Sequence, residues 1–281
     1  MTETAITRAC VIGWPITQSR SPLIHGYWLK AYGINGRYTK EAIAADEVEA
    51  FLSTLDARGF VGCNVTVPHK IAAYQVAFLK DASATAVGAA NTLWLENGQL
   101  ACANTDTYGF MTNLAATAPA WSAYDGPVMV LGAGGSARAV VFGLLQAGRR
   151  DVRVYNRSLD RAEGLARQLG AGVSAHAWAA RNAHARDAAL IVNTTTLGMN
   201  GIGDPAIDFA VARSHCVAAD LVYVPLETAF LRHAKDHGLQ VVGGLGMLLH
   251  QAVPGFARWF GVTPDVTDDL YRLIARDIEG A

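Results

Sequence analysis

Polar side chains interrupt the apolar pattern of the first part of the chain at four places. They are Ser19-Arg20-Ser21, residues 64–70, Ala90-Asn91-Thr92 and Asn104-Thr105-Asp106. Each cluster lies at or just beyond the end of an expected strand, and ligands of parallel α/β sheets bind at the carboxyl ends of the strands. The side chains offer hydroxyls, amides, one ammonium group and one carboxylate, without a nucleophile–base pair for acyl transfer or a metal-ligating cluster. This set suits a small polyhydroxylated acid.

A glycine-rich turn in the second part of the chain follows an apolar strand expected over residues 128–131 and opens a helix. Gly132 allows a tight turn, Gly134 lets the backbone approach a pyrophosphate, and Ala137 stands where a small residue packs helix on strand. The helix N-terminus offers free N–H groups and its positive dipole end to the phosphates. The pattern predicts a dinucleotide site. Its expected contacts are Gly132, Ala133, Gly134, Gly135, Ser136 and Ala137.

The end of the next strand, expected over residues 152–155, distinguishes between the two nicotinamide cofactors. NAD-binding proteins carry an acid there that bonds the ribose 2′-hydroxyl. This chain has Asn156, Arg157 and Ser158 instead, with Arg161 four residues after Arg157. The planar guanidinium group of arginine suits a phosphate, so we expect NADP rather than NAD. The alternative is that Ser158 only caps a helix and both arginines are solvated.

The elements that must position these residues follow an α/β pattern. The 281 residues suit two domains, and 51% of them are hydrophobic, which is enough to bury large cores. Short β-branched runs alternate with longer alanine-rich stretches, which predicts parallel strands, with a doubly wound second half. A tight turn is expected at Asn97-Gly98, and the C-terminal part predicts two helices interrupted at residues 261–264. The expected strands are 10–13, 36–40, 60–65, 89–95, 99–103, 128–131, 152–155, 190–193, 217–221 and 240–242.

Two early helices carry recognisable end signals. Ser21 before Pro22 predicts an N-cap, and Gly33 predicts the left-handed residue after the helix. Asp46 and Glu49 have the spacing of a capping box at the start of the second helix.

Composition narrows the class of protein. The formal net charge is -1, from 23 basic and 24 acidic residues, which gives no electrostatic case for binding nucleic acid or an anionic membrane. No apolar run is long enough to span a bilayer, and the N-terminal stretch lacks the pattern of a targeting signal. The four cysteines are scattered without metal-ligand spacing, as expected of buried thiols in a reducing compartment. We therefore expect a cytoplasmic protein. The cysteines are Cys10, Cys63, Cys102 and Cys216.

Several segments together resemble the shikimate dehydrogenase family, which includes quinate dehydrogenases. They match its motifs in order and spacing over nearly the whole chain. The family implies NADPH-dependent reduction of 3-dehydroshikimate to shikimate, a step of aromatic amino-acid and chorismate biosynthesis. It also implies a substrate domain over residues 1–107, completed by 247–281, and a Rossmann-type NADP-binding domain over 108–246. The segments are GWPITQSRSPLIH at 13–25, NVTVPHK at 64–70, AANT at 89–92, NTD at 104–106, GAGG at 132–135 and GLGMLLHQ at 244–251.

The resemblance also implies roles for single residues. Lys70 and Asp106 match the catalytic pair. Ser19 and Ser21 resemble the hydroxyls that hold the substrate carboxylate, and Tyr223 resembles a residue of the substrate cleft. Residues that resemble those holding the ring hydroxyls are Asn64, Thr66, Asn91 and Gln251. Residues that match the nicotinamide side are Thr195, Leu221, Gly244 and Met247. Two departures, Gln18 where many relatives have histidine and Leu221 where methionine is also seen, remove no charge or hydroxyl to which a role is assigned.

The expected chemistry fits the catalytic pair. Hydride arrival at a carbonyl carbon places negative charge on the oxygen, which the Lys70 ammonium group can stabilise and protonate. A neighbouring Asp106 carboxylate would favour the charged lysine and orient it. The sequence alone gives only an ammonium and a carboxylate at separate strand ends, and the resemblance supplies their proximity.

Alternatives stay open at this point. A quinate or dual quinate/shikimate dehydrogenase differs by recognition of one tertiary hydroxyl, and a catalytically silent NADP-binding regulator would use the same fold. His233 and His237 have the spacing of a metal pair, but no third ligand is evident, so no metal is expected. The oligomeric state is left open, with a homodimer as one option.

Overall fold

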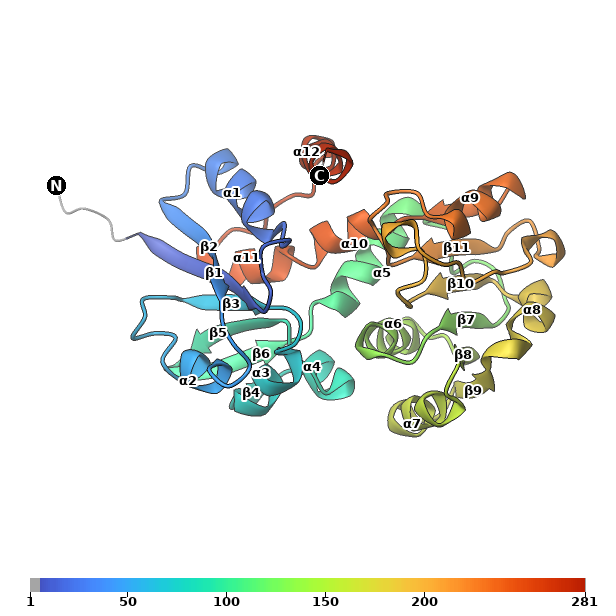
Figure 1. The fold of residues 1–281 in the computed structure, drawn as a ribbon, viewed down its shortest axis with the longest axis horizontal. Helices are drawn as coiled ribbons and strands as arrows, with labels where there is room; N and C mark the ends of the chain where they lie inside the picture. The colour runs from blue at the N-terminus through green and yellow to red at the C-terminus, as the bar shows by residue number, and fades with distance from the viewer. Residues whose placement is uncertain (1–5, 281) are drawn as a thin grey trace. The chain divides into compact units, whose positions relative to one another are not determined.

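The computed structural model describes residues 6–280, so the first residues of the N-terminal stretch that was searched for a targeting signal lie outside the described part. The chain divides into two compact units (Figure 1). Unit 1 comprises Met1–Thr105 and Gln251–Ile274, and unit 2 comprises Asp106–His250 and Ala275–Ala281. Within residues 6–280, no helix is both long and apolar enough to cross a membrane.

Unit 1 contains a six-stranded sheet in the order β2-β1-β3-β5-β6-β4. β1 pairs in parallel with β2 and β3, whereas β5 runs antiparallel to both β3 and β6. The expected parallel pairing is confirmed for β1, β2 and β3. The expected tight turn is confirmed as well, because Asn97 and Gly98 adopt φ values of 51° and 77° and reverse the chain between β5 and β6, which makes the sheet mixed. The strands are β1 (Thr7–Gly13), β2 (Gly36–Ala42), β3 (Gly62–Val65), β4 (Leu79–Lys80), β5 (Thr92–Glu96) and β6 (Gln99–Ala103).

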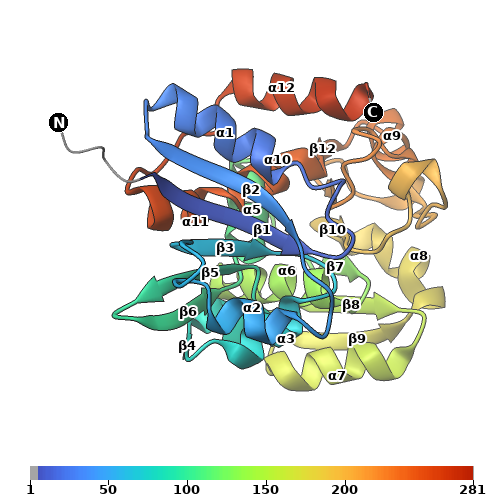
Figure 2. The same ribbon diagram turned by 60° about the vertical axis from the view of Figure 1, so that its left-hand side comes forward.

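Helices cover both faces of the sheet in unit 1 (Figure 2). One face packs Cys10, Ile12 and Cys63 against α2, α3 and α4. On the other face, His25 and Trp28 of α1 pack against Phe256 of α11. The two expected C-terminal helices, α11 and α12, are confirmed. The helices are α1 (Ser21–Ala31), α2 (Val48–Ser53), α3 (Lys70–Val76), α4 (Ala82–Val87), α11 (Val253–Phe260) and the part of α12 (Asp268–Glu279) that precedes Ala275.

The expected helix ends were partly wrong. Gly33, with a φ of 62°, ends α1 as expected. Ser21, however, is the first helical residue, and Arg20 occupies the N-cap without a side-chain cap. The N-cap of α2 is Glu47, whose carboxylate bonds the backbone N–H of Ala44 at 3.2 Å, so the expected capping box does not form. The N-cap of α1 thus lies one residue before the expected Ser21, and the N-cap of α2 lies one residue after the expected Asp46.

Unit 2 contains an all-parallel sheet in the order β12-β11-β10-β7-β8-β9. This confirms the doubly wound order, whose direction reverses between β7 and β10. β9 was not expected, because its sequence contains a single β-branched residue, Val173. The strands are β7 (Val128–Leu131), β8 (Val152–Asn156), β9 (Val173–Ala177), β10 (Leu190–Asn193), β11 (Val217–Asp220) and β12 (Gln240–Val242).

The unit 2 sheet is buried on both faces. Val128 and Val130 of β7 face a core shared with α5, α6 and α7. Met129 and Leu131 face the opposite core, to which α9 contributes Phe230. The continuous apolar runs of these strands follow from this double burial. The helices are α5 (Asp106–Thr117), α6 (Gly135–Gln146), α7 (Leu159–Leu169), α8 (Arg181–His184), α9 (Ala229–Asp236) and α10 (Gly244–His250).

Candidate active site

The four polar clusters of the first part of the chain meet at one edge of the unit 1 sheet. β1 and β3 are parallel and both end at this edge. β1 ends at Gly13, ahead of Ser19 in the chain, and β3 ends at Val65. β5 is antiparallel to β3, so its start at Thr92 lies at the same edge, where Thr92 is the register partner of Asn64. β6 ends there too, at Ala103 opposite Thr92. The mixed sheet thus gathers one strand start and three strand ends.

A buried hydrogen-bond network joins the amides at this edge. The Nδ2 atom of Asn64 donates to the backbone oxygen of Asn91 and to Oγ1 of Thr92, both at 3.1 Å. The hydroxyl of Tyr38 donates to Oδ1 of Asn64 at 2.6 Å. All four residues are buried. The orientation of the Asn64 amide is therefore fixed from both sides.

The second amide of the network is Asn91. Its Oδ1 accepts from the backbone N–H of Thr105 at 2.8 Å and from the Thr105 hydroxyl at 3.1 Å. Its Nδ2 lies 3.5 Å from Oε1 of Gln251, which also lies 3.5 Å from the Thr105 hydroxyl. The structure therefore brings together three of the four residues expected to hold ring hydroxyls, namely Asn64, Asn91 and Gln251.

A buried histidine lies beneath this network. The ring of His25 stacks on Tyr38 with centroids 3.9 Å apart and planes 8° apart. Among the described residues, no hydrogen-bond partner reaches either ring nitrogen. Burial lowers the pKa of His25 from 6.5 to about 3, an effect that the neighbouring Asn64 amide only partly opposes. His25 is therefore a neutral aromatic packing residue at ordinary pH.

The remaining expected substrate residues of unit 1 lie at the same edge. The backbone N–H of Ser21 points to Oγ of Ser19 at 3.4 Å, and Ser21 is 8% exposed. Thr66 is half-buried just after β3, and its methyl group would lie 2.6 Å from a Cβ on Gly13. Lys70 is half-buried at the start of α3, where its carbonyl accepts from the backbone N–H of Ala90 at 2.9 Å.

Asp106 begins α5 and is half-buried, directly after the buried Thr105. Lys70 belongs to unit 1 and Asp106 to unit 2. The pairing of their side chains spans the two units and stays a prediction.

The glycine loop of unit 2 has the geometry of a phosphate cradle. Gly132 adopts a φ of 109°, and a Cβ there would meet Thr194 Oγ1 at 2.8 Å, so both the turn and the packing require glycine. A Cβ on Gly134 or Gly135 would meet no atom of the described chain within 4 Å. Ala137 is fully buried. The side-chain positions of Gly134 and Gly135 at the start of α6 are therefore open, which leaves room for a pyrophosphate at this helix N-terminus.

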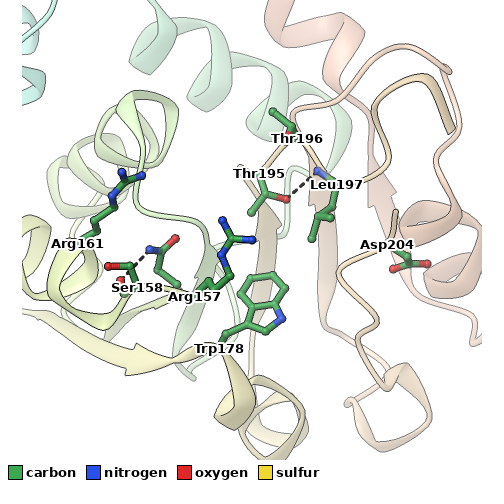
Figure 3. Close-up of a pocket in the computed structure, with 9 residues that line it drawn as sticks. Arg157, Ser158, Arg161, Trp178, Thr195, Thr196, Leu197 and Asp204 are labelled. Carbon is green, nitrogen blue, oxygen red and sulfur yellow. Dashed lines mark hydrogen bonds between the residues drawn. The ribbon is translucent and has the colours of Figure 1, made fainter. Parts of the chain in front are cut away.

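A cavity of about 630 Å³ lies beyond β8 and β10, and the side chains of Arg157 and Arg161 line it (Figure 3). Asn156 ends β8 and donates from Nδ2 to the backbone oxygen of Ser158 at 2.8 Å, so no carboxylate stands at this strand end. Ser158 occupies the N-cap of α7, but its side chain makes no cap hydrogen bond. The full lining is Asn156, Arg157, Ser158, Arg161, Trp178, Thr195, Thr196, Leu197 and Asp204.

The residues expected on the nicotinamide side lie on loops that follow β10 and β11 and on α10. Thr195 donates from its hydroxyl to Oδ1 of Asn193 at 2.7 Å. Leu221 follows β11, and a Cβ on Gly244 would lie 2.4 Å from its carbonyl oxygen, so α10 begins in direct contact with this loop. Met247 packs against the core that contains β7. Tyr223 is half-buried two residues after Leu221.

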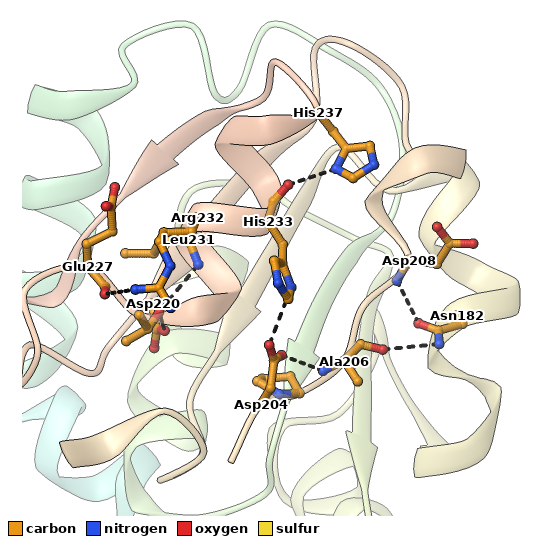
Figure 4. Close-up of polar contacts among 12 residues, drawn as sticks. Asn182, Asp204, Ala206, Asp208, Asp220, Glu227, Leu231, Arg232, His233 and His237 are labelled. Carbon is orange, nitrogen blue, oxygen red and sulfur yellow. Dashed lines mark hydrogen bonds and ion pairs between the residues drawn. The ribbon is translucent and has the colours of Figure 1, made fainter. Parts of the chain in front are cut away.

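His233 and His237 do not converge. The Nδ1 atom of His233 faces Asp204 at 3.4 Å, whereas Nδ1 of His237 lies 2.8 Å from the carbonyl oxygen of His233 (Figure 4). Their side chains therefore have different partners.

Sequence reasoning missed several residues of the candidate site. Trp178 and Asp204 line the cavity, but Trp178 begins a short 3-10 helix and Asp204 lies in an irregular segment, both outside the expected strands. Tyr38 lies on β2, two strands away from Asn64 on β3. Asn193 and Asp220 were missed as well. The signal that could have found them is that each is the polar last residue of a buried parallel strand.

The fold and the glycine loop define a class: a two-unit α/β protein with a Rossmann-type, dinucleotide-binding second unit. Family models match three stretches of this chain. They are the shikimate dehydrogenase substrate binding domain over residues 11–93, shikimate / quinate 5-dehydrogenase over 114–218, and the shikimate 5′-dehydrogenase C-terminal domain over 244–268.

Whole proteins match as well. A shikimate dehydrogenase (NADP(+)) of Brucella abortus is 54% identical over 98% of this chain and 96% of its own length. The crystal structure of shikimate 5-dehydrogenase from Thermus thermophilus in complex with NADP(H) and shikimate is 34% identical, with a TM-score of 0.83 over 97% of this chain and 100% of that one. Quinate dehydrogenase from Corynebacterium glutamicum in complex with NAD is 26% identical, with a TM-score of 0.88 over 96% and 99%. This chain belongs to the shikimate dehydrogenase family.

Proposed function

We propose that this protein is an NADP-dependent shikimate dehydrogenase that interconverts 3-dehydroshikimate and shikimate in the pathway to chorismate and the aromatic amino acids. The observation that carries the proposal is the gathering of hydroxyl and amide side chains at one edge of the unit 1 sheet. A 54% identical relative with the NADP-dependent activity supports it.

The substrate site that we propose contains two kinds of groups. Ser19 and Ser21 bind the carboxylate, and hydrogen-bonding groups at the end of β3, just before β5 and between α10 and α11 bind the ring hydroxyls. A site built to satisfy substrate hydroxyls discriminates strongly, because a ligand that lacks them leaves buried polar groups unpaired. The hydroxyl-binding residues are Asn64, Thr66, Asn91 and Gln251, with Tyr223 in the cleft.

Bound NADPH supplies the hydride, and Lys70 and Asp106 manage the charge on the substrate oxygen. In the reducing direction, the Lys70 ammonium group stabilises the oxygen as it becomes negative and then donates a proton to it. Asp106 favours the charged form of the lysine and orients it. In the oxidising direction, the neutral amine of Lys70 takes the hydroxyl proton and becomes the ammonium group.

The cofactor site that we propose begins at the glycine loop and ends at the two arginines. The open space before Gly134 and Gly135 receives the pyrophosphate, with the backbone from Gly132 to Ala137 around it. Arg157 and Arg161 line the neighbouring cavity and bind the 2′-phosphate, next to Asn156 and Ser158. The nicotinamide lies near Thr195, Leu221, Gly244 and Met247.

We assign residues 1–107 and 247–281 to the substrate domain and 108–246 to the NADP-binding domain. The two compact units support this division, although residues 106–107, 247–250 and 275–281 cluster with the second unit. A cytoplasmic location is part of the proposal, and the four buried, free cysteines support it.

The experiment that tests the function measures initial rates with shikimate and with quinate, each with NADP and with NAD. We expect the highest kcat/KM for shikimate with NADP. Efficient quinate oxidation would instead support the dual dehydrogenase, for which the structural similarity to quinate dehydrogenase is the specific observation. A strong NAD preference would overturn the assignment of Arg157 and Arg161.

A catalytically silent regulator is the alternative from another class. Retention of Lys70 and Asp106 together with the polar network argues against it. Protein that binds NADPH but turns over neither acid would favour the regulator and contradict the proposal.

A further inference from the structure

The strands β10 and β11 end in a pair of polar residues that are buried. Asn193 and Asp220 are register partners at the carboxyl ends of these parallel strands. The Nδ2 atom of Asn193 donates to Oδ1 of Asp220 at 2.9 Å. Asn193 is fully buried and Asp220 is 2% exposed. These ends lie at the edge of a doubly wound sheet where ligands bind.

Asn193 uses both ends of its amide. Its Nδ2 also donates to the backbone oxygen of Leu197 at 3.0 Å. Its Oδ1 accepts from the backbone N–H of Thr195 at 3.1 Å and from the Thr195 hydroxyl at 2.7 Å. The same hydroxyl accepts from the backbone N–H of Leu197 at 3.1 Å. A flipped amide would oppose donor to donor and acceptor to carboxylate, so Asp220 selects the orientation that holds Thr195.

Asp220 receives donors from three separate segments. Besides Asn193, the backbone N–H of Val222 donates to Oδ1 at 3.0 Å, and the Thr228 hydroxyl donates to Oδ2 at 2.6 Å. Thr228 is the N-cap of α9, where its oxygen accepts from Leu231. Figure 4 shows Asp220 beneath the start of this helix. One carboxylate thereby joins β10, the loop after β11 and α9.

A carboxylate at this position is costly, because burial penalises its charge. Burial raises the pKa of the Asp220 carboxyl to about 6, against the lowering effect of its three hydrogen bonds and with the Asp204 carboxylate raising it further. An amide could replace it only in part, because its oxygen would still accept from Asn193 and Val222 but its NH2 group would have to donate to the Thr228 hydroxyl. The cost is best explained if the loops that it joins need a fixed geometry.

We propose that Asp220 is a positioning residue of the cofactor site, which holds Thr195 and the 195–197 backbone in place through Asn193. This inference rests on the proposed function, because Thr195 is assigned there to the nicotinamide side. The 195–197 segment lines the same cavity as Arg157 and Arg161. Asp220 itself touches neither substrate nor cofactor in this account.

The test substitutes Asp220→Ala, which removes both oxygens, and measures the dissociation constant of NADPH by fluorescence titration, together with kcat and both KM values. We expect NADPH affinity to fall about tenfold, the scale of a lost charge-assisted hydrogen bond, with the KM for shikimate nearly unchanged. Asp208→Ala is the matched control, because its exposed carboxylate also accepts a backbone N–H, from Ala210 at 3.1 Å, outside this network. A folded Asp220→Ala variant with wild-type NADPH affinity would overturn the proposal.

A double-mutant cycle with Thr195→Val tests the path through Asn193. If Asp220 acts through Thr195, the double variant should lose little more affinity than the worse single variant. If the fold losses in NADPH affinity of the two single variants instead multiply in the double variant, Asp220 does not act through Thr195. Should Asp220→Ala fail to fold, Asn193→Ser cuts the same link and carries the same expectation. Wild-type NADPH affinity in that variant would overturn the proposal. The titration needs no turnover, so it separates this inference from a failure of the shikimate activity.

Discussion

The hydroxyl of Tyr38 donates a hydrogen bond of 2.6 Å to Oδ1 of Asn64 across the intervening strand β1. The register partner of Tyr38 on β1 is Ala9, a small residue. The Nδ2 atom on the other side of the same amide donates to the backbone oxygen of Asn91 and to the hydroxyl of Thr92. The amide that we assign to the substrate is thus held by a residue on a strand outside the polar clusters.

We therefore expect Tyr38→Phe to raise the KM for shikimate while leaving NADPH affinity unchanged. The loss should be about 1 kcal/mol, or roughly fivefold, because one buried hydrogen bond is removed without changing the ring. Tyr27→Phe is the matched control, since the Tyr27 hydroxyl makes an exposed contact of 3.2 Å with Thr267 in the same unit. Equal KM values for Tyr38→Phe and the wild type would show that the bond does not position Asn64.

Acid should destabilise the protein through His25. The pKa is lowered from 6.5 to about 3 in the folded state, so the unfolded state binds more protons between these values and stability falls as pH drops below about 6.5. The slope reaches about 1.4 kcal/mol per pH unit for one group. Urea unfolding of the wild type and of His25→Phe between pH 7 and pH 4 isolates this effect.

In that comparison the difference in unfolding free energy between the two proteins should grow more favourable to His25→Phe as pH falls. Asp220 has the opposite sign, because its raised pKa makes the folded state bind more protons between 3.8 and about 6, but it cancels in the difference. A difference that does not vary with pH would contradict a buried, neutral His25.

The start of α10 should not tolerate a methyl group. A Cβ on Gly244 would lie 2.4 Å from the Leu221 carbonyl oxygen, whereas a Cβ on Gly243 would meet no atom of the described chain closer than 3.7 Å. We expect Gly244→Ala to cost about 1–3 kcal/mol by overpacking and to weaken NADPH binding by displacing Leu221. Gly243→Ala is the control and should stay near the wild type in thermal unfolding and NADPH titration. Similar behaviour of the two variants would refute the close approach.

Cofactor choice should depend on Arg157 and Arg161. Removing either guanidinium should weaken NADP binding about tenfold or more, because a charge-assisted bond to phosphate is lost, and should leave NAD binding unchanged. Arg167→Ala is the control, since Arg167 is an exposed residue of α7 that pairs with Glu163 at 3.6 Å. Equal losses for NADP and NAD would exclude a specific contact to the 2′-phosphate.

The sequence predicted those elements whose structure is determined by residues adjacent in the chain. Asn97-Gly98 predicted the β5–β6 hairpin, and the apolar run before Gly132 predicted β7 and the loop after it. β9 escaped because Val-Ser-Ala-His-Ala carries little β-propensity and forms a strand only by pairing with β8. Ser21 is the first helical residue rather than the N-cap, because the backbone oxygen of Arg20 already accepts from the N–H groups of Leu23 and Ile24.

Site residues were predictable where a motif carried them and not where only the fold joins them. Asn64 and Asn91 lie in motifs, and the antiparallel β5 brings them together at one edge. Tyr38 and Asp220 act across strands, so their contacts depend on register and burial. No short-range pattern encodes such contacts.

The most direct test of the account is the turnover number of Lys70→Ala with shikimate and NADP, measured beside its NADPH dissociation constant. Lys70 is assigned to proton transfer and charge stabilisation, which typically contribute 10²–10⁴-fold. We predict that kcat falls by roughly this range while NADPH affinity stays within about twofold of the wild type. A Lys70→Ala variant with wild-type turnover would contradict the catalytic assignment.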